Sequence, residues 1–465
     1  MQANDPPNIV FVLIDDMGWN AISCYGNKHV ETPNIDRLAK EGMKFTDAYA
    51  MPQCSPTRFT FLTGQYCART NMNAVVMEKH VMPFARMIQP ESTRILPPEA
   101  LTIGKVMREA GYHVGTIGKW HIDLRETINK QKLGVEKYLD QYGFDIMPII
   151  DGIPDEPKGV MNYTQATLDY LDVNRDRPTL AYLAHHTVHT KMLAPTELIE
   201  KHVARGYKKS PTVQGVIEDR PTADFLAMID YLDKSIGVLM EGIQALKLSR
   251  ETLIIFMSDN GGLARVWDCS PLRRGKGSEY EGGVRVPLIM HWPGRIEAGK
   301  VIAEPVHIVD LFPTMLELSD GELEDNYILD GESLVPLMLQ TGTLNREAIY
   351  MNTPLYIPHY NKTPSCFIRM GDYKLIKFYG DYLEETDIKK IVPRSKIELF
   401  NVRNDISEQN DLLKIMPEKA KIMEKMLDDW LEETGARKPI INENFDSKKW
   451  KEATSHKVDD DGNYY

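Results

Sequence analysis

Residues 8–16 read Asn8-Ile9-Val10-Phe11-Val12-Leu13-Ile14-Asp15-Asp16. The apolar run is rich in β-branched side chains, which is typical of a strand buried on both faces of a parallel sheet. It ends abruptly in two carboxylates, so these stand at the carboxyl end of the expected strand. Ligands of open α/β sheets collect outside the carboxyl ends of the strands. The segment therefore predicts a central strand with a polar site at its end.

Three more strand-like runs lie downstream, and each is followed by polar residues. They are residues 112–117 before Gly118-Lys119-Trp120-His121, residues 180–184 before His185-His186-Thr187-Val188-His189, and residues 253–258 before Asp259-Asn260-Gly261-Gly262. Helical patterns separate the runs over about the first three quarters of the chain, as in parallel strands joined by crossover helices. We therefore expect an α/β fold with a large, mostly parallel sheet flanked by helices.

Two of the connecting helices carry clear signals. Thr32 as N-cap, Pro33 in the first turn and Gly42 just past the end predict a helix over residues 33–41. Apolar residues at helical spacing predict a second helix over residues 223–246.

The pattern changes in the last quarter of the chain. Short strands are expected at 366–370 and 373–378, separated by a Gly371-Asp372 turn, which predicts an antiparallel hairpin. We therefore expect a larger domain over residues 1–345 and a smaller C-terminal α+β domain over residues 346–465, built on a short antiparallel sheet. The tail from Lys448 onward is polar, and we expect it to be mobile.

Composition excludes several classes of protein. Of the 465 residues, 42% are hydrophobic, which is enough to bury the cores of both expected domains. A formal net charge of −12 argues against nucleic acid as the main partner. The longest apolar runs, 9–14 and 253–257, are far too short for a membrane span. The N-terminus also lacks the basic start and the apolar region of a signal peptide.

Five scattered cysteines, without Cys-x-x-Cys spacing, indicate neither a disulfide framework nor a zinc site, although one pair that includes Cys24 could still form a bridge. Cys54 differs from the others by its context, because it opens the pattern Cys-x-Pro-x-Arg-x-x-x-Leu-Thr-Gly over residues 54–64. Pro56 suits the first turn of a helix, so we expect Cys54 one residue before the helix start, at the end that favours an anion. A small buried hydrophobic residue is the commoner role of a cysteine.

Four oxygen donors follow two of the expected strands: Asp15, Asp16, Asp259 and Asn260. A site of oxygen ligands favours Ca²⁺ or Mg²⁺ over zinc, because neither thiolate nor imidazole is among these donors. Each pair alone could equally be a turn after a strand, where such residues are common.

A glycine-rich segment with basic residues covers residues 275–287 and includes Lys276. It lacks the order Gly-x-x-x-x-Gly-Lys-Ser/Thr that a nucleotide-binding P-loop requires. The segment therefore gives no support to a nucleotide site.

Taken together, these motifs resemble those of the formylglycine-dependent sulfatases, members of the alkaline phosphatase-like superfamily. The resemblance runs from Asn8 to about Leu413, includes residues 398–405 of the smaller domain, and is strongest to bacterial glycan sulfatases. It implies that a formylglycine-generating maturation enzyme oxidises Cys54 to formylglycine (3-oxoalanine), whose hydrate is the nucleophile. It also implies one Ca²⁺ per chain, with these ligands: Asp15, Asp16, the modified Cys54, Asp259 and Asn260.

The resemblance assigns catalytic roles as well. Arg58, Lys119 and Lys276 would hold the sulfuryl oxygens, and Asp259 would take a proton from the nucleophile. His189, assisted by Lys276, would protonate the departing alcohol.

Two further histidine assignments complete this expectation. His121 would take a proton from the remaining hydroxyl, so that sulfate is expelled and the aldehyde forms again. The family usually has a proline two residues after its substrate-side histidine, and here Lys191 stands two residues after His189, so His185 or His186 could hold that role instead.

The expected substrate is a sulfated carbohydrate. Residues 71–99, the loop 264–267 and the smaller domain are expected to surround the pocket, because loops at strand ends carry specificity. Trp267 could stack on a sugar ring, Arg265 could bind a carboxylate or second sulfate, and His186 could touch the substrate. Each of these side chains could equally serve ordinary loop packing.

Two other functions use the same motifs. A phosphonate monoester or phosphodiester hydrolase would need a closely similar site, and a non-catalytic glycan-binding relative would be expected if Cys54 were never converted. The resemblance also implies a periplasmic or secreted location.

Overall fold

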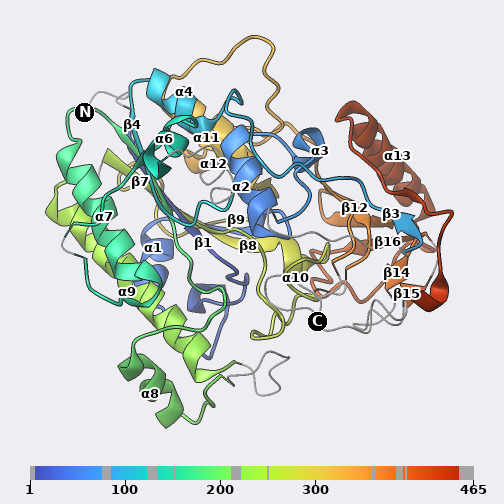
Figure 1. The fold of residues 1–465 in the computed structure, drawn as a ribbon, viewed down its shortest axis with the longest axis horizontal. Helices are drawn as coiled ribbons and strands as arrows, with labels where there is room; N and C mark the ends of the chain where they lie inside the picture. The colour runs from blue at the N-terminus through green and yellow to red at the C-terminus, as the bar shows by residue number, and fades with distance from the viewer. Residues whose placement is uncertain are drawn as a thin grey trace.

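The structure is a computed structural model that describes residues 6–75, 85–122, 134–150, 152–210, 221–248, 251–357, 360, 362–383, 391–392 and 395–449. Most of the tail predicted to be mobile from Lys448 onward lies outside these residues. A large sheet lies between two layers of helices, and a smaller sheet with its own helix lies beside it (Figure 1). No helix within the described ranges is long and apolar enough to cross a membrane.

The large sheet has the strand order β10-β2-β8-β7-β1-β6-β4-β5, and β9 pairs with β2. Most neighbouring strands are parallel, and only the pairs that include β8 are antiparallel. The α/β expectation is therefore confirmed. The strands are β1 (Asn8–Ile14), β2 (Met43–Tyr49), β4 (His113–Gly118), β5 (Asp145–Ile146), β6 (Thr179–Ala184), β7 (Thr252–Ser258), β8 (Arg285–His291), β9 (Lys300–Ile302) and β10 (Val306–His307).

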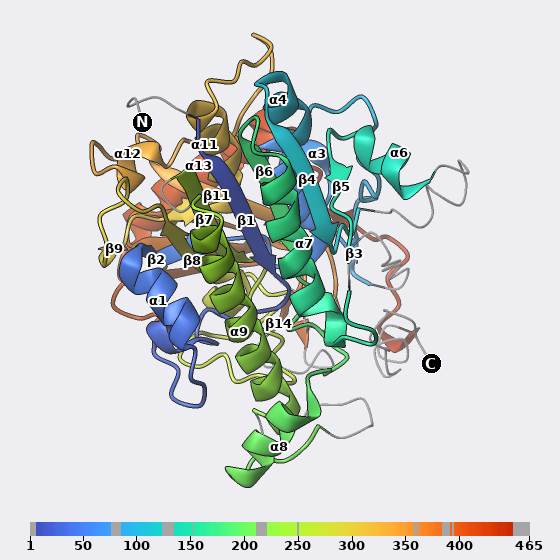
Figure 2. The same cartoon turned by 90° about the vertical axis from the view of Figure 1, so that its left-hand side faces the viewer.

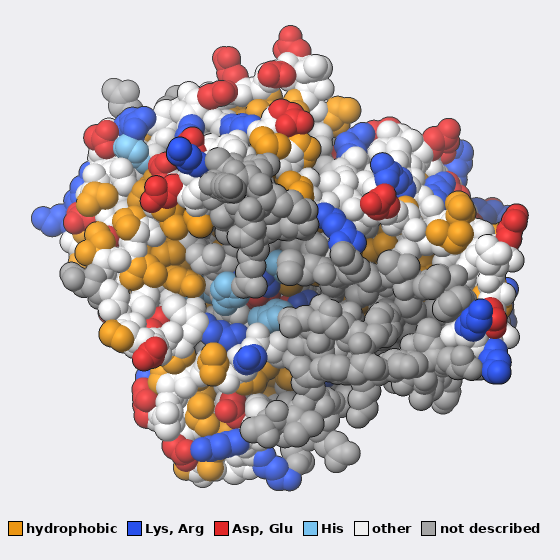
Figure 3. Space-filling view, viewed as in Figure 1, with side chains coloured by type: hydrophobic (Ala, Val, Ile, Leu, Met, Phe, Trp, Pro, Cys, Tyr) orange, Lys and Arg blue, Asp and Glu red, His pale blue; other side chains and the backbone are white. Residues whose placement is uncertain are grey.

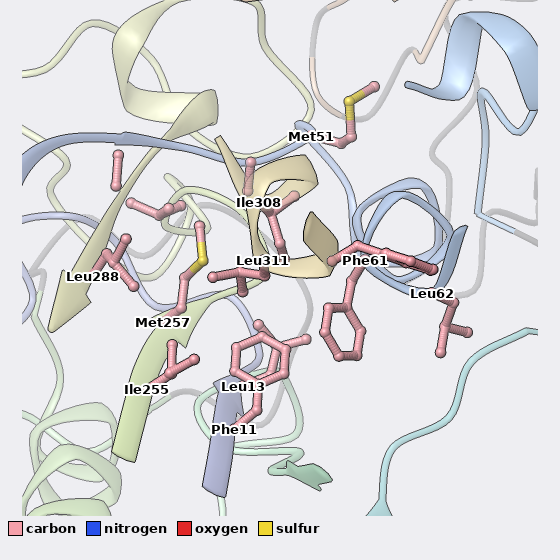
Figure 4. Packing of buried hydrophobic residues seen from close by; sticks show 14 of the residues in the cluster. Phe11, Leu13, Met51, Phe61, Leu62, Ile255, Met257, Leu288, Ile308 and Leu311 are labelled. Atoms are coloured by element: carbon pink, nitrogen blue, oxygen red, sulfur yellow. The ribbon is translucent and has the colours of Figure 1, made fainter. Parts of the chain in front are cut away.

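Alternation along β1 explains why its run is apolar throughout. Ile9, Phe11 and Leu13 point to one face, where α2 (Cys54–Thr63), α4 (Ile103–Glu109) and α11 (Leu311–Leu318) pack. Figure 4 shows this core from close by, with side chains of β1 and β7 facing those of α2 and α11.

The alternate residues of β1, Val10, Val12 and Ile14, belong to a second core on the opposite face. There the sheet is covered by α1 (Pro33–Glu41), α7 (Val160–Val173) and α9 (Ala223–Ala245), and Figure 2 shows α7 and α9 lying across it. The remaining short elements are η1 (Ser23–Tyr25), α3 (Cys67–Thr70), α6 (Val135–Asp140), η2 (Pro157–Gly159), α8 (Thr196–Ala204), α10 (Glu281–Val284), η4 (Ile308–Asp310) and α12 (Val335–Met338).

The smaller sheet is antiparallel, with the order β11-β12-β13-β16, and α13 (Pro417–Glu433) packs against it. The predicted hairpin is confirmed, because Met370 pairs with Tyr373 around a turn in which Gly371 has φ 54°. Its strands are β11 (Ala348–Thr353), β12 (Ser365–Met370), β13 (Tyr373–Phe378) and β16 (Lys396–Asn401), and two short pairs join β14 (Tyr382–Leu383) to β15 (Ile391–Val392) and β3 (Met87–Ile88) to β17 (Ile440–Ile441).

Helix boundaries agree closely with the sequence signals. The first predicted helix is α1 over the expected residues, and α9 begins at Ala223, where Thr222 accepts a hydrogen bond from Phe225 N. However, α2 begins at Cys54 itself, one residue earlier than expected, with extended Gln53 in the N-cap position. All five cysteines are free, so the open possibility of a disulfide that includes Cys24 is wrong.

Two buried ion-pair groups join the segment after Lys276 to the smaller sheet. Lys362 Nζ lies 2.7 Å from Glu279 Oε2, and both side chains are fully buried. Lys374 Nζ lies 2.9 Å from Glu281 Oε1 and 3.0 Å from Glu408 Oε1. The smaller sheet therefore fixes the position of the loop that carries Lys276.

We expect Lys362→Met to lower the free energy of unfolding by about 3–5 kcal/mol, because it leaves the buried Glu279 carboxylate without its cation. Denaturant titration measures the loss. The double variant Lys362→Met/Glu279→Gln removes both charges and should recover much of it. A double variant that is less stable than Lys362→Met alone would contradict this explanation.

Candidate active site

The carboxyl ends of β4, β6, β1 and β7 meet at one edge of the large sheet. Hydrogen bonds continue beyond the strands: Asp259 N donates to Ile14 O, His185 N to Leu13 O, and Lys119 N to Ala184 O. The polar segments that follow the four apolar runs are therefore held side by side, as parallel strands require.

Four side chains converge at this edge. Asp15, Asp16, Asp259 and Cys54 are buried, and one ligand atom from each lies within 4.8 Å of all the others. Cys54 comes from the first residue of α2, while the carboxylates come from the ends of β1 and β7. Residues far apart in the sequence thus form one compact cluster.

Each carboxylate of the cluster has its own cation. Lys119 Nζ lies 2.5 Å from Asp15 Oδ2, Lys276 Nζ lies 2.6 Å from Asp16 Oδ1, and Arg58 Nη2 lies 2.8 Å from Asp259 Oδ2. These are the three basic residues that the sequence motifs suggested. A buried carboxylate without such a partner would be strongly disfavoured as an anion.

The cations set the pKa values of the carboxyls. Burial by itself would raise the pKa of Asp15, but the charge of Lys119, together with those of His189, Lys276 and Arg58, outweighs burial and holds this pKa well below its usual range. The charges of Lys276, His189 and Lys119 together lower the pKa of Asp16 against the opposing effects of burial and of Asp15. Burial and the nearby Asp15 charge raise the pKa of Asp259 to about 6, despite Arg58. A divalent cation beside these groups would lower all three values.

The donor set fits a hard cation. Asp16 Oδ2 and Asn260 Oδ1 are buried and accept no hydrogen bond, although Asn260 Nδ2 donates to Asp16 Oδ1 at 2.9 Å. A buried oxygen without a donor is disfavoured unless another partner, such as a metal ion, satisfies it. Three carboxylates and one amide oxygen are the ligands that Ca²⁺ takes in proteins.

Cys54 is not prepared to act as a thiolate. Its Sγ lies 3.4 Å from Asp15 Oδ1 and 3.3 Å from Lys276 Nζ. Burial is the main cause that raises the pKa of the Cys54 thiol, and the charge of Asp259 adds to it. The helix N-terminus, which favours an anion, is therefore outweighed at this position.

Arg58 is surrounded by acceptors. Besides the Asp259 carboxylate, its guanidinium donates to Lys119 O at 2.6 Å and to Tyr182 Oη at 3.1 Å. The side chain is fully buried, and its charge raises the share of Asp259 that is ionised. These contacts hold the Asp259 side chain in a defined orientation.

We expect Arg58→Met to lower the free energy of unfolding by about 3–5 kcal/mol in metal-free buffer, since Asp259 then keeps a buried charge without its partner. Chemical denaturation followed by circular dichroism measures this. Arg37→Met on α1 is the control, because the half-exposed Arg37 side chain forms a long 3.9 Å ion pair with the exposed Glu241, so its loss should change stability by less than about 1 kcal/mol. Equal losses in the two variants would contradict the prediction.

The histidines are close to the cluster and differ in their settings. His189 Nδ1 lies 2.7 Å from Thr190 O, and its Nε2 lies 3.6 Å from Asp16 Oδ2. The His189 ring is therefore held by the main chain with Nε2 facing the carboxylates. Burial lowers the pKa of His189 below its usual value.

The other histidines differ from His189. His121 Nδ1 is buried without a hydrogen-bond partner, and burial holds its pKa well below the usual value. His185 is fully buried with neither ring nitrogen hydrogen-bonded, whereas His186 is exposed. Of the two alternatives to His189, only His186 is open to solvent.

The expectation that Trp267 stacks on a sugar is wrong. Its side chain is 2% exposed, stacks on Phe225 with ring centroids 5.1 Å apart, and donates from Nε1 to Asn20 Oδ1. Burying the large apolar ring of Trp267 in the core removes more of its surface from water, and so contributes more free energy, than a position at the surface would. Arg265 is half-buried, so its predicted role at the substrate stays a prediction.

Three residues near the site were missed from the sequence. Tyr182 contacts Arg58, the centroid of the Tyr360 ring lies 5.8 Å from Lys276 Nζ, and Lys158 donates to His189 O. Tyr182 lies inside an apolar run, and the other two lie in loops without a motif. Only the tertiary contacts identify them.

The surface above the cluster is hollowed. Figure 3 shows histidine, basic and acidic side chains gathered on the floor of this hollow. Of the segment 71–99 that was expected at its rim, residues 76–84 lie outside the described chain.

Comparisons with known proteins agree with this geometry. The sulfatase family pattern matches residues 7–321, and that of the N-sulphoglucosamine sulphohydrolase C-terminal region matches residues 275–435. Arylsulfatase A of Homo sapiens is 31% identical and covers 79% of this chain and 74% of its own length. A sulfatase of Formosa agariphila is 28% identical and covers 88% of this chain and 85% of its own.

Solved structures agree as well. Ps i-CgsB, in a complex with k-i-k-neocarrahexaose, superimposes with a TM-score of 0.70 at 26% identity and covers 92% of this chain and 93% of its own. The phosphonate monoester hydrolase of Agrobacterium radiobacter reaches a TM-score of 0.63 at 18% identity over 92% of this chain and 96% of its own, which shows a shared fold alone. The family pattern spans every residue of the cluster. The chain therefore belongs to the sulfatase family and is a sulfuric ester hydrolase.

Proposed function

We propose that this enzyme hydrolyses a sulfate monoester of a carbohydrate, with a formylglycine made from Cys54 and one bound Ca²⁺. The observation that carries the proposal is the position of Cys54 among three buried carboxylates and their three cations. A thiol with a raised pKa in such a place is a poor nucleophile, so conversion of the side chain explains why a cysteine stands there.

The proposed Ca²⁺ ligands are the oxygens of Asp15, Asp16, Asp259 and Asn260, together with the converted residue 54. Bound there, the ion supplies positive charge for the sulfuryl oxygens. The hydrated aldehyde supplies a hydroxyl as nucleophile. A formylglycine-generating maturation enzyme is therefore a required partner, and a periplasmic or secreted location remains a prediction.

The basic residues would stabilise negative charge on the sulfuryl group. Lys119 and Lys276 lie within hydrogen-bond distance of Asp15 and Asp16, and each ammonium has donors left for the ester. Such fixed charges act strongly where water is excluded. Arg58 would act through Asp259, whose carboxylate it orients toward residue 54 as proton acceptor.

His189 would give a proton to the leaving alcohol, because its Nε2 faces the carboxylates and the ring is fixed through Nδ1. His121 would accept the proton that is released when sulfate leaves. Its buried Nδ1 has no hydrogen-bond partner, and its lowered pKa keeps the ring neutral, so a ring nitrogen has a lone pair that can accept a proton. The burial of His185 argues against a proton transfer to substrate from that residue.

The test is a screen of sulfated mono- and oligosaccharides for released inorganic sulfate, with a phosphonate monoester and a phosphodiester as further arms. Mass spectrometry of the peptide that carries residue 54 establishes that the tested enzyme contains the aldehyde. We expect sulfate release from a carbohydrate ester to exceed turnover of both phosphorus esters. Aldehyde-containing enzyme that binds sulfated sugars without hydrolysing any would favour the glycan-binding function, and preferred turnover of a phosphorus ester would favour the other hydrolase.

A further inference from the structure

Lys158 stands beside the active site although no sequence motif includes it. It belongs to η2 (Pro157–Gly159), the short turn that leads into α7, and it has φ 56°. Its Nζ donates a hydrogen bond to His189 O. A non-glycine residue in this left-handed conformation is uncommon, and such residues gather at functional sites.

Lys158 differs from the other three basic residues near the cluster in how its charge is balanced. Each of Lys119, Lys276 and Arg58 contacts a carboxylate of the cluster, whereas Lys158 forms an ion pair with none of the acidic residues that the structure describes. Burial lowers the pKa of Lys158 to about 8, although the charges of Asp15 and Asp16 favour its protonated form. A partly buried ammonium in this setting gains from an added anion.

The neighbouring side chain on this part of the site is uncharged. Part of His186 is exposed to solvent, but the protein around its ring, together with the positive charges of Lys119, Arg58 and Lys158, lowers its pKa to about 4. At neutral pH, His186 can therefore donate or accept a hydrogen bond without competing for an anion. An ammonium has three donors, and the bond to His189 O uses one of them.

We propose that Lys158 binds a second anionic oxygen group of the substrate, next to the sulfate ester that is cleaved. The inference rests on the proposed function, and it names the substrate class as a sulfated sugar with a further carboxylate or sulfate. Since Lys158 contacts the main chain of His189, the second anion is held at the side of the site where the alcohol leaves.

The experiment compares three probes with aldehyde-containing enzyme: N-acetylglucosamine 6-O-sulfate, glucosamine 2-N,6-O-disulfate and a sulfated hexuronic acid. The first carries one anionic group, the second adds a sulfate, and the third adds a carboxylate. Sulfate release gives kcat and KM for each probe, and competition against an aryl sulfate gives the affinity of a probe that is turned over slowly.

For wild-type enzyme we expect tighter binding of at least one doubly anionic probe. Lys158→Met keeps the stem of the side chain and removes the charge, so it should raise KM for that probe about 10- to 100-fold. It should change kcat/KM for the singly charged probe by less than about threefold, because that probe has no second anion that Lys158 could bind. The probe that responds identifies the second anion as sulfate or carboxylate.

Two further variants sharpen the result. Lys158→Arg keeps a cation and should retain most of the preference, while Lys40→Met, on the exposed surface of α1, should behave as wild type. Equal losses on all three probes in Lys158→Met would mean that the residue merely positions His189, and the proposal would be overturned. Unchanged kinetics on all probes would overturn it as well.

Failure of the proposed function has a different signature. In that case, wild-type enzyme with a verified aldehyde would release sulfate from none of the sugars in the wider screen. Hydrolysis by wild type without any preference for a second anion would refute only the role of Lys158.

Discussion

Replacing Cys54 with alanine is expected to reduce kcat for sulfate release by about 10⁴- to 10⁶-fold, because it removes the proposed nucleophile and leaves only binding and electrostatic effects. The ratio of the two kcat values is measured from steady-state release of inorganic sulfate, with both enzymes produced together with the maturation enzyme. The neighbouring side chains of the cluster are carboxylates held by cations, and none of them can replace the lost group.

Cys67→Ala is the matched control for this variant. Cys67, the first residue of α3, is also fully buried. Its Sγ contacts Thr60 Oγ1 and Pro56 O of α2, the helix that begins at Cys54. The Cys67→Ala enzyme should keep a kcat within about threefold of the wild-type value, because the Cys67 thiol takes no part in the reaction. Full turnover by the Cys54→Ala enzyme would rule out the nucleophile assignment.

Activity should also follow the aldehyde content of residue 54. Preparations made with and without a maturation enzyme give different fractions of converted protein, which mass spectrometry measures on the peptide. We expect kcat per total enzyme to rise in proportion to that fraction. Equal activity in fully unconverted protein would show that the thiol itself suffices, against the raised pKa that burial imposes on it.

Replacing His189 with alanine is expected to lower kcat on a carbohydrate sulfate by about 10²- to 10⁴-fold, the usual contribution of general acid catalysis. The physical reason is that a sugar alkoxide is a poor leaving group and needs a proton as the ester bond breaks. A nitrophenyl sulfate releases a stable phenolate, so its hydrolysis should fall much less in the same variant. The two kcat ratios, measured side by side, test the role of His189.

His186→Ala is the control, because His186 lies in the same cluster, is exposed, and was left open as an alternative acid. We expect it to affect both esters alike and only modestly. A leaving-group dependence that appears in His186→Ala instead of in His189→Ala would transfer the assignment to His186. The hydrogen bond from Lys158 to His189 O should keep the loop in place in both variants.

The topology could be predicted because its signals are local. The strand β1, the helix α1 and the hairpin of β12 and β13 follow from apolar runs, caps and a turn that a few adjacent residues determine. The grouping of Asp15 with Asp259 followed from one general rule, since the carboxyl ends of parallel strands share an edge.

Other features depended on which residues meet across long stretches of chain. The burial of Trp267 against Phe225 and the contact of Lys158 with His189 had no local signal. The same holds for the pairing of Arg58 with Asp259, two residues that are 201 positions apart in the sequence.

The sequence by itself thus determined the α/β architecture, the set of oxygen donors and the special context of Cys54. Only the tertiary structure decided that each carboxylate has its own cation, that the Cys54 thiol stays protonated, and that Lys158 keeps a charge without a carboxylate partner among the described residues. The physical reason is the distance along the chain over which each kind of interaction acts. Backbone preferences and apolar periodicity act over a few residues, whereas burial and ion pairing depend on neighbours that folding brings together from distant segments.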